Sequence, residues 1–219
     1  NRRKRLLIAD MDSTMIEQEC IDELADAVGI KAEVAAITAR AMNGELDFAQ
    51  ALRTRVKLLK GLPRSRIEEV RRERITFAPG GRALVQTMKA YSAYTSLVSG
   101  GFTIFADFIG KRIGFDEAMA NILEFDGDVL AGTVADPILG REAKLSRLQT
   151  LAAYHDIPMA ATLAVGDGAN DLDMIKAAGL GVALHAKPVV AAQAQVKIDH
   201  GDLTALLYLQ GYSDEEFVR

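Results

Sequence analysis

The chain has a single cysteine, Cys20, among its 219 residues. One thiol forms neither an internal disulfide nor a thiolate metal cluster, so we expect Cys20 to pack as a small core residue. The chain also lacks any apolar run near the roughly 18 residues that a bilayer span requires. Its basic opening leads directly into a short strand rather than into a signal-peptide core. These absences predict a cytoplasmic protein without a membrane partner.

The excess of one charge over the other is small. The 26 Lys and Arg residues against 30 Asp and Glu give a net charge of -4. This balance provides no broad basic surface for nucleic acid or anionic lipid, and it favours a small-molecule partner. The chain begins with Asn1 rather than Met, which leaves room for a regulatory domain upstream. The sequence leaves the oligomeric state open.

The apolar pattern changes its period twice along the chain. Residues 5–9 predict a buried strand that enters a polar loop, whereas residues 16–75 follow helical periods with glycine stop signals. Beyond residue 81 strands and helices alternate, with a small hairpin near residues 124–137. The predicted fold is α/β, a doubly wound, Rossmann-like parallel sheet formed by residues 1–14 and 76–219. Residues 15–75 are predicted to form an inserted all-helical cap, and the hairpin a flap.

Polar segments follow three of the predicted strands. Asp10 and Asp12 are two carboxylates that repel each other unless a cation or proton lies between them. In the segment Ser99-Gly100-Gly101 the two glycines free backbone amides to approach an anion, and the serine hydroxyl adds a donor. The segment 166–171 supplies the hard oxygen ligands that magnesium prefers. Because parallel strands end at one edge of the sheet, these segments are expected to meet there. Taken singly, each is also compatible with an ordinary turn or helix cap.

The same segments, together with Lys144, resemble the four ordered motifs of the haloacid dehalogenase superfamily, and within it those of the phosphoserine phosphatases. A lone helical lysine such as Lys144 would otherwise be interpreted as a surface residue. The motifs are DMDST at 10–14, SGGF at 99–102, Lys144 and GDGAND at 166–171. The likeness covers nearly the whole chain, since it extends to FTIFA at 102–106, GFD at 114–116 and DPILG at 136–140.

This resemblance implies a Mg²⁺-dependent hydrolysis of O-phosphoserine to serine and phosphate, the last step of serine biosynthesis, through an aspartyl-phosphate. Asp10 is implied as the nucleophile, and Asp12 as the general acid and base, with a pKa raised by its carboxylate neighbours. The metal is implied to be held by Asp10, Asp167 and the backbone carbonyl of Asp12, with Asp171 supporting the site. The groups implied to bind phosphate are Ser99, the Gly100 amide, Lys144, which is also counted as catalytic, and Asn170.

Substrate choice is implied to come from the cap. Arg55 lies close to the apolar stripe of its own helix and therefore needs a partner. In the family pattern Arg55 binds the substrate carboxylate and Glu19 the ammonium, with Met42 and Phe48 as walls. Two alternatives are left open, an ion pair between Arg55 and Glu19 and an Arg55 side chain that reaches water.

Two other functions are left open by the sequence. One is a phosphatase or phosphotransferase of the same superfamily that acts on another small phosphate ester, for example with homoserine as acceptor. The other is a non-catalytic phosphate-binding regulator that retains the fold. The sequence does not distinguish D- from L-phosphoserine.

Overall fold

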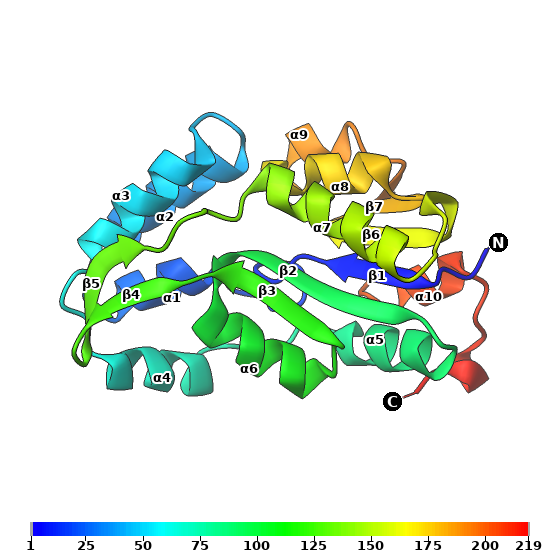
Figure 1. Cartoon of the computed structure of the whole chain (residues 1–219), viewed down its shortest axis with the longest axis horizontal. Coiled ribbons are helices and arrows are strands. Elements are labelled where there is room, and N and C mark those ends of the chain that lie inside the picture. Colours follow the sequence, from blue (N-terminus) through cyan, green and yellow to red (C-terminus); the bar gives the residue numbers. More distant parts are fainter. Residues whose placement is uncertain (1, 219) are drawn as a thin grey trace.

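A computed structural model describes residues 2–218, and its centre is a parallel sheet covered by helices on both faces (Figure 1). Within the described residues the sheet has six strands in the order β3-β2-β1-β6-β7-β8. Strand order reverses at β1, and ligands of open parallel sheets bind at such a point, outside the carboxyl ends of the strands. The strands are β1 (Leu6–Ala9), β2 (Tyr94–Phe102), β3 (Glu117–Asn121), β6 (Thr162–Gly166), β7 (Leu180–Leu184) and β8 (Val196–Ile198).

The apolar run of β1 packs against both helical layers. Successive side chains of a strand point to opposite faces. Leu7 and Ala9 accordingly join the core on the side of α5 and α6, whereas Leu6 and Ile8 join the core on the side of α7 and α8. The helices of this part are α5 (Gly81–Ala90), α6 (Thr103–Ile113), α7 (Arg141–Tyr154), α8 (Leu172–Ala177), α9 (Pro188–Ala191) and α10 (Ala205–Leu209), with 3-10 turns η1 (Met159–Ala161), η2 (Ala169–Asp171) and η3 (Asp214–Glu216).

A group of helices, here called the cap helices, lies between β1 and α5 in the sequence, at one end of the molecule (Figure 1). They are α1 (Cys20–Asp26), α2 (Lys31–Met42), α3 (Phe48–Leu58) and α4 (Arg64–Glu73). The strands β4 (Leu123–Asp126) and β5 (Val129–Val134) form the predicted antiparallel hairpin. The domain limits at residues 14/15 and 75/76 stay a prediction.

The hairpin is bonded to the cap helices. The backbone N–H of Gly61 donates to the carbonyl of Leu130 at 2.8 Å, and that of Leu130 donates to Leu62 at 2.9 Å. The N–H of Arg64 donates to Asp128 at 2.8 Å. Backbone hydrogen bonds therefore tie the hairpin to the connection between α3 and α4.

Some elements differ from the sequence-based expectations. Ile16 was assigned to the first helix, but it forms an antiparallel bridge with Phe77, and the helix begins at Cys20. The segment 99–101 was expected as a loop after a strand; it belongs to β2, where the pairing with β3 shifts register between Val98 and Phe102. A register shift of this kind bends a strand and redirects its groups, and such shifts are frequent beside active sites.

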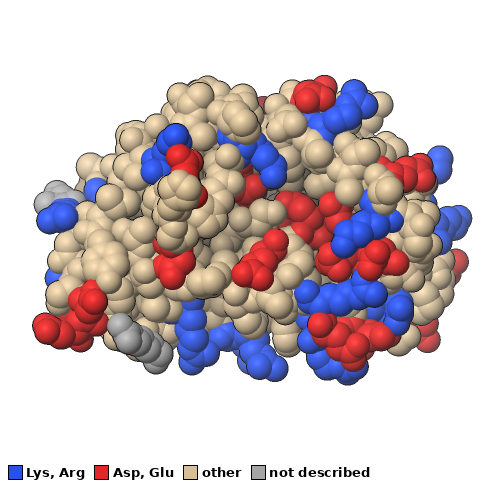
Figure 2. All heavy atoms as spheres, turned by 180° about the vertical axis from the view of Figure 1, so that it is seen from behind, with Lys and Arg blue, Asp and Glu red and all other residues tan. Residues whose placement is uncertain are grey.

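Charged side chains of both signs are interspersed on the surface, and Figure 2 shows them side by side on the rear face, including the corner formed by α4. Arg3 forms an ion pair with Glu216 at 2.7 Å and lies over the rings of Tyr91 and Tyr212.

No helix within residues 2–218 combines the length and the apolar character needed to cross a membrane.

The buried side chain of Asn121, at the end of β3, connects two segments next to the predicted site. Its Nδ2 donates to the carbonyls of Gly100 and Leu139, and its Oδ1 accepts from the N–H of Leu139 at 2.7 Å. Asn121→Ala should lower the free energy of unfolding by about 2–4 kcal/mol, because buried backbone groups lose their partners. Urea denaturation would measure this, with Asn43→Ala, at the exposed end of α2, as a control expected to cost less than about 0.5 kcal/mol. Equal losses in the two variants would contradict the assignment.

Candidate active site

The loop that follows β1 turns tightly and brings two carboxylates to the edge of the sheet. The N–H of Asp10 donates to the carbonyl of Val165 on β6, which continues the pairing of β1 by one residue. The carbonyl of Met11 then accepts bonds from the N–H groups of three later residues, and Ser13 adopts a left-handed conformation. Because the chain folds back here, Asp10 and Asp12 are both buried under the cap helices.

Lys144 on α7 lies between two carboxylates. Its Nζ donates to Oδ1 of Asp10 and to Oδ1 of Asp171, each at 2.6 Å, and its side chain is 1% exposed. The Oδ2 atom of Asp171 accepts from the N–H groups of Asp167 and Gly168. Both oxygens of Asp171 therefore already accept hydrogen bonds from the protein. The ammonium of Lys144 has three N–H bonds and uses two of them here, so one remains for a ligand.

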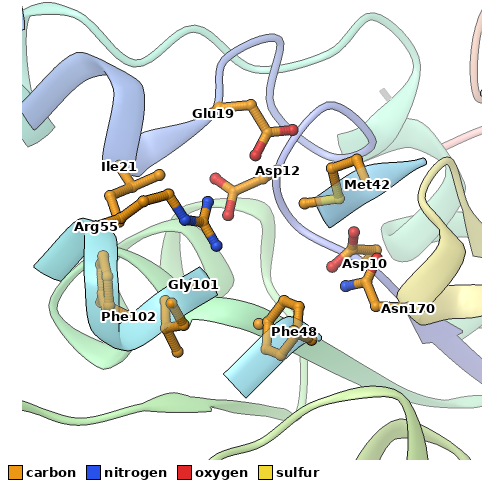
Figure 3. A pocket seen from close by; sticks show the side chains of 12 residues that line it. Asp10, Asp12, Glu19, Ile21, Met42, Phe48, Arg55, Gly101, Phe102 and Asn170 are labelled. Atoms are coloured by element: carbon orange, nitrogen blue, oxygen red, sulfur yellow. The ribbon is translucent and has the colours of Figure 1, made fainter. Parts of the chain in front are cut away.

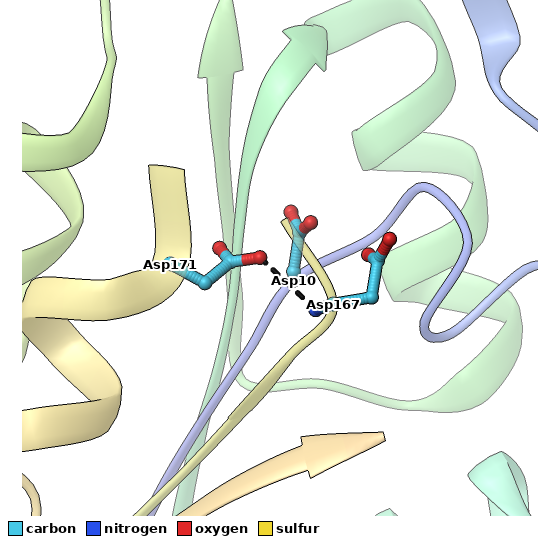
Figure 4. Close-up of side chains that lie close together, drawn as sticks. All are labelled: Asp10, Asp167 and Asp171. Carbon is cyan, nitrogen blue, oxygen red and sulfur yellow. Dashed lines mark hydrogen bonds between the residues drawn. The ribbon is translucent and has the colours of Figure 1, made fainter. Parts of the chain in front are cut away.

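Asp10, Asp167 and Asp171 form a cluster in which one oxygen of each lies within 4.8 Å of the others, and Figure 4 shows Asp10 between the other two. The Oδ1 of Asp167 accepts from Thr14 at 3.2 Å. Its Oδ2 is buried and has no hydrogen-bond partner among the described residues, and the same holds for Oδ1 of Asn170. Unpartnered buried oxygens beside clustered carboxylates fit a hard cation. The fit favours Asp10 and Asp167 as ligands, because the oxygens of Asp171 already have donors.

Burial governs the protonation of these acids. Burial raises the pKa of Asp10 well above its usual range, and the charge of Asp171 raises it further. The ammonium of Lys144 lowers this pKa but does not cancel the rise. The same two causes raise the pKa of Asp167 to about 7. Burial alone would lower the pKa of Lys144, but Asp10 and Asp171 raise it above its usual value. The lysine therefore stays charged and keeps compensating the carboxylates.

The carboxyl group of Asp12 lies in a different environment. Its Oδ1 accepts from the N–H of Cys20, the first residue of α1, at 3.0 Å. Its Oδ2 faces Gly101, where a Cβ atom would approach it to 2.7 Å, so a side chain at this position would collide with the carboxylate. Burial raises the pKa of Asp12, and hydrogen bonds from Cys20 oppose the rise. Carboxylate neighbours were the expected cause of the raised pKa of Asp12; the cause found is burial.

A pocket lies between this edge of the sheet and the cap helices, as Figure 3 shows. Arg55 extends from α3 toward Asp12, and its side chain is buried; it does not reach water. No ion pair joins Arg55 to Glu19 within residues 2–218, although both line the pocket. The Oε1 of Glu19 accepts from the hydroxyl of Ser13 at 2.7 Å. Burial and the charge of Asp12 raise the pKa of Glu19 well above its usual range.

The apolar walls of the pocket touch the glycine segments. The ring of Phe48 packs so closely on Gly100 that a Cβ there would lie 2.6 Å from its Cζ. The sulfur of Met42 would lie 2.8 Å from a Cβ at Gly168. Only glycine lets the cap side chains approach these two glycine-containing segments to this extent.

Most residues singled out in the sequence meet in this region. The predicted residues that line the pocket are Asp10, Asp12, Glu19, Met42, Phe48, Arg55, Gly100 and Asn170. Ser99, Lys144, Asp167 and Asp171 are buried beside or beneath it. The sequence-based interpretation missed Thr38 and Asp22, which support Arg55, and Asn121. A threonine at a buried position of an amphipathic helix was the available signal for Thr38.

A family model described as haloacid dehalogenase-like hydrolase matches residues 7–176. The chain belongs to this family. Among its relatives in the family, a phosphoserine phosphatase of Streptomyces coelicolor is 45% identical over 98% of this chain and 52% of its own length. Another, of Haemophilus influenzae, is 45% identical over 95% of this chain and 66% of its own length. The chain thus spans about half to two thirds of the length of these curated relatives.

Solved structures of phosphoserine phosphatases have the same fold. A phospho-aspartyl intermediate analogue of phosphoserine phosphatase aligns with a TM-score of 0.90 and 40% identity, covering 94% of this chain and 98% of that one. A substrate-bound phosphoserine phosphatase complex aligns with a TM-score of 0.90 and 39% identity, covering 95% and 99%. The predicted α/β fold of this family is thereby confirmed.

The buried ammonium of Lys144 should matter for stability as well as for chemistry. Lys144→Met keeps the volume but leaves Asp10 and Asp171 without their cation, and should lower the free energy of unfolding by about 3 kcal/mol. The matched control is Arg141→Met on the same helix, which breaks the partly exposed ion pair with Asp173 and should cost less than about 1 kcal/mol. Urea denaturation in the presence of a chelator measures both, and a larger loss in the control would contradict this account.

Proposed function

We propose that the chain hydrolyses O-phosphoserine to serine and phosphate, the activity after which its relatives are named. One arrangement carries the proposal: a buried carboxylate, Asp10, held by an ammonium at the floor of a pocket whose other wall presents Arg55 and Glu19. Phosphoserine carries a phosphate, a carboxylate and an ammonium. The charges of the pocket complement each of these groups.

In the first step, Asp10 attacks phosphorus. Lys144 holds Oδ1 of this carboxylate, so we assign the attack to Oδ2. A bond forms between this oxygen and phosphorus, and the bond from phosphorus to the serine oxygen breaks. The departing serine oxygen takes a proton from the carboxyl group of Asp12, for which the raised pKa of this acid is suited.

In the second step, water attacks the phosphorus of the aspartyl-phosphate and gives a proton to Asp12. The bond between phosphorus and Asp10 breaks, and phosphate leaves. The covalent intermediate on Asp10 thus divides one difficult displacement into two easier ones. The third N–H bond of Lys144, the hydroxyl of Ser99, the amide of Gly100 and Asn170 are the donors that we assign to the phosphate oxygens.

We assign Mg²⁺ to Asp10, Asp167 and the backbone carbonyl of Asp12, with Asp171 as the residue that orients the loop of Asp167. A bound cation supplies positive charge that lets the anionic nucleophile approach an anionic phosphate. The unpartnered Oδ2 of Asp167 supports this assignment.

Specificity is assigned to the cap helices. Arg55 binds the substrate carboxylate through charge-assisted hydrogen bonds, and Glu19 accepts from the substrate ammonium. An incoming ammonium would favour the charged form of Glu19, which burial disfavours. We treat residues 15–75 as a cap domain on this basis. We also place the reaction in the cytoplasm, as predicted from the lack of a membrane-spanning run and of a signal-peptide core in the sequence.

Asp10→Asn should abolish turnover while the protein stays folded, because the amide is nearly isosteric but is no nucleophile. Phosphate release from phosphoserine measures turnover, and circular dichroism checks the fold. Treating the unaltered enzyme with a chelator should also suppress turnover, and added Mg²⁺ should restore it. Turnover that persists in Asp10→Asn, or that ignores the chelator, would contradict the mechanism.

Arg55→Ala should weaken phosphoserine binding by about 2–5 kcal/mol, because a desolvated carboxylate loses its charged partner. Phosphoethanolamine keeps the phosphate and the ammonium but lacks the carboxylate, so its hydrolysis should change much less. KM values for both substrates measure the difference. Equal losses on the two substrates would exclude a carboxylate clamp.

A further inference from the structure

Arg55 is 2% exposed, yet its guanidinium has no ion-pair partner among residues 2–218. It makes two hydrogen bonds: Nε donates to the carbonyl of Ala51 on its own helix at 3.2 Å, and Nη1 donates to Oγ1 of Thr38 at 3.0 Å. A guanidinium has five N–H bonds in a planar fork. The part of the fork that is not bonded to protein adjoins the pocket, which Arg55 lines (Figure 3).

The hydroxyl of Thr38 on α2 connects this guanidinium to a carboxylate. Oγ1 lies 2.7 Å from Oδ1 of Asp22 on α1 and 3.1 Å from the carbonyl of Val34. A hydroxyl has one proton to donate. The shorter contact, to a charged acceptor, is the stronger one, so the proton points to Asp22 and a lone pair of the oxygen faces Arg55.

We propose that Thr38 and Asp22 are positioning residues, which fix the guanidinium of Arg55 before the substrate carboxylate arrives. The inference rests on the proposed function, in which Arg55 binds that carboxylate. The chain of contacts from Asp22 through Thr38 to Arg55 joins α1, α2 and α3, so the direction of the fork is set by the packing of these helices.

The intervening hydroxyl has a specific consequence. A carboxylate bonded directly to a guanidinium in the bidentate manner occupies two of its N–H groups and competes with any second carboxylate. With Thr38 between them, Asp22 contributes its negative charge nearby while leaving the pocket side of the fork to the ligand. Burial lowers the pKa of Arg55, and the charges of Glu19 and Asp22 oppose this effect. Asp22 thus stabilises the buried positive charge of Arg55 without occupying the N–H groups that face the pocket.

Thr38→Val removes the hydroxyl and keeps the branched shape. It should raise KM for phosphoserine about tenfold, because the guanidinium loses one hydrogen bond that holds it in place. kcat should stay within about twofold, since no group at the phosphorus changes. KM for phosphoethanolamine, which has no carboxylate, should not change. Thr38→Ser retains the hydroxyl and should restore the KM of the unaltered enzyme.

The matched control is Thr54→Val on α3, whose hydroxyl donates to the carbonyl of Gln50, four residues earlier, on the exposed side of the helix. It should leave KM unchanged for both substrates. Asp22→Asn keeps an acceptor for Thr38 but removes the charge, and should raise KM for phosphoserine about threefold. This variant also carries the test if Thr38→Val does not fold.

The outcomes separate this inference from the proposed function. If the unaltered enzyme favours phosphoserine over phosphoethanolamine but the Thr38→Val and Asp22→Asn variants keep its KM, the positioning role is wrong and the proposed function stands. An equal rise of KM for both substrates would also refute the role. If the unaltered enzyme does not favour phosphoserine, the proposed function fails and the positioning role fails with it.

Discussion

The contact of the Lys144 ammonium with Asp10 and Asp171, at 2.6 Å to each, is the interaction on which the rest of the site depends. Three carboxylates lie buried within one small cluster at the end of β1 and β6. Charges of one sign in such a place destabilise the fold unless a cation compensates them. Lys144 supplies part of that compensation from α7, but Oδ2 of Asp167 has no partner among residues 2–218. The negative charge of the cluster is therefore only partly compensated by the protein.

Under the proposed function, the same edge of the sheet admits an anionic substrate while little water enters. Gly100 and Gly168 have no side chains, and this allows Phe48 to lie directly on the end of β2 and Met42 on the segment that follows β6. Exclusion of water strengthens each electrostatic interaction inside the pocket. The strong effects of burial on the acids, seen in the raised pKa values of Asp10 and Glu19, belong to this closed arrangement.

Sequence patterns predicted the parallel sheet, the helices between β1 and α5, and the residues that gather at the pocket. Strong periodicity and the resemblance of four motifs account for this success. β3 was missed because its sequence, EAMAN, has no run of β-branched residues. Ile16 was misassigned because a helical period extended into a segment that pairs with Phe77. The motifs did not predict the roles of Thr38 and Asn121, because these roles depend on contacts between elements that are distant in the sequence.

The hairpin illustrates how an element far from the chemistry constrains it. β5 shares backbone hydrogen bonds with the connection between α3 and α4, while the strands of the hairpin follow β3 directly. Lifting Phe48 away from Gly100 must either break those bonds or carry the hairpin along as one body. The polypeptide would then have to flex at the two segments that flank the cap helices and also at both legs of the hairpin. Because these backbone bonds tie β5 to the connection between α3 and α4, opening and closing the pocket would move the hairpin together with the cap helices.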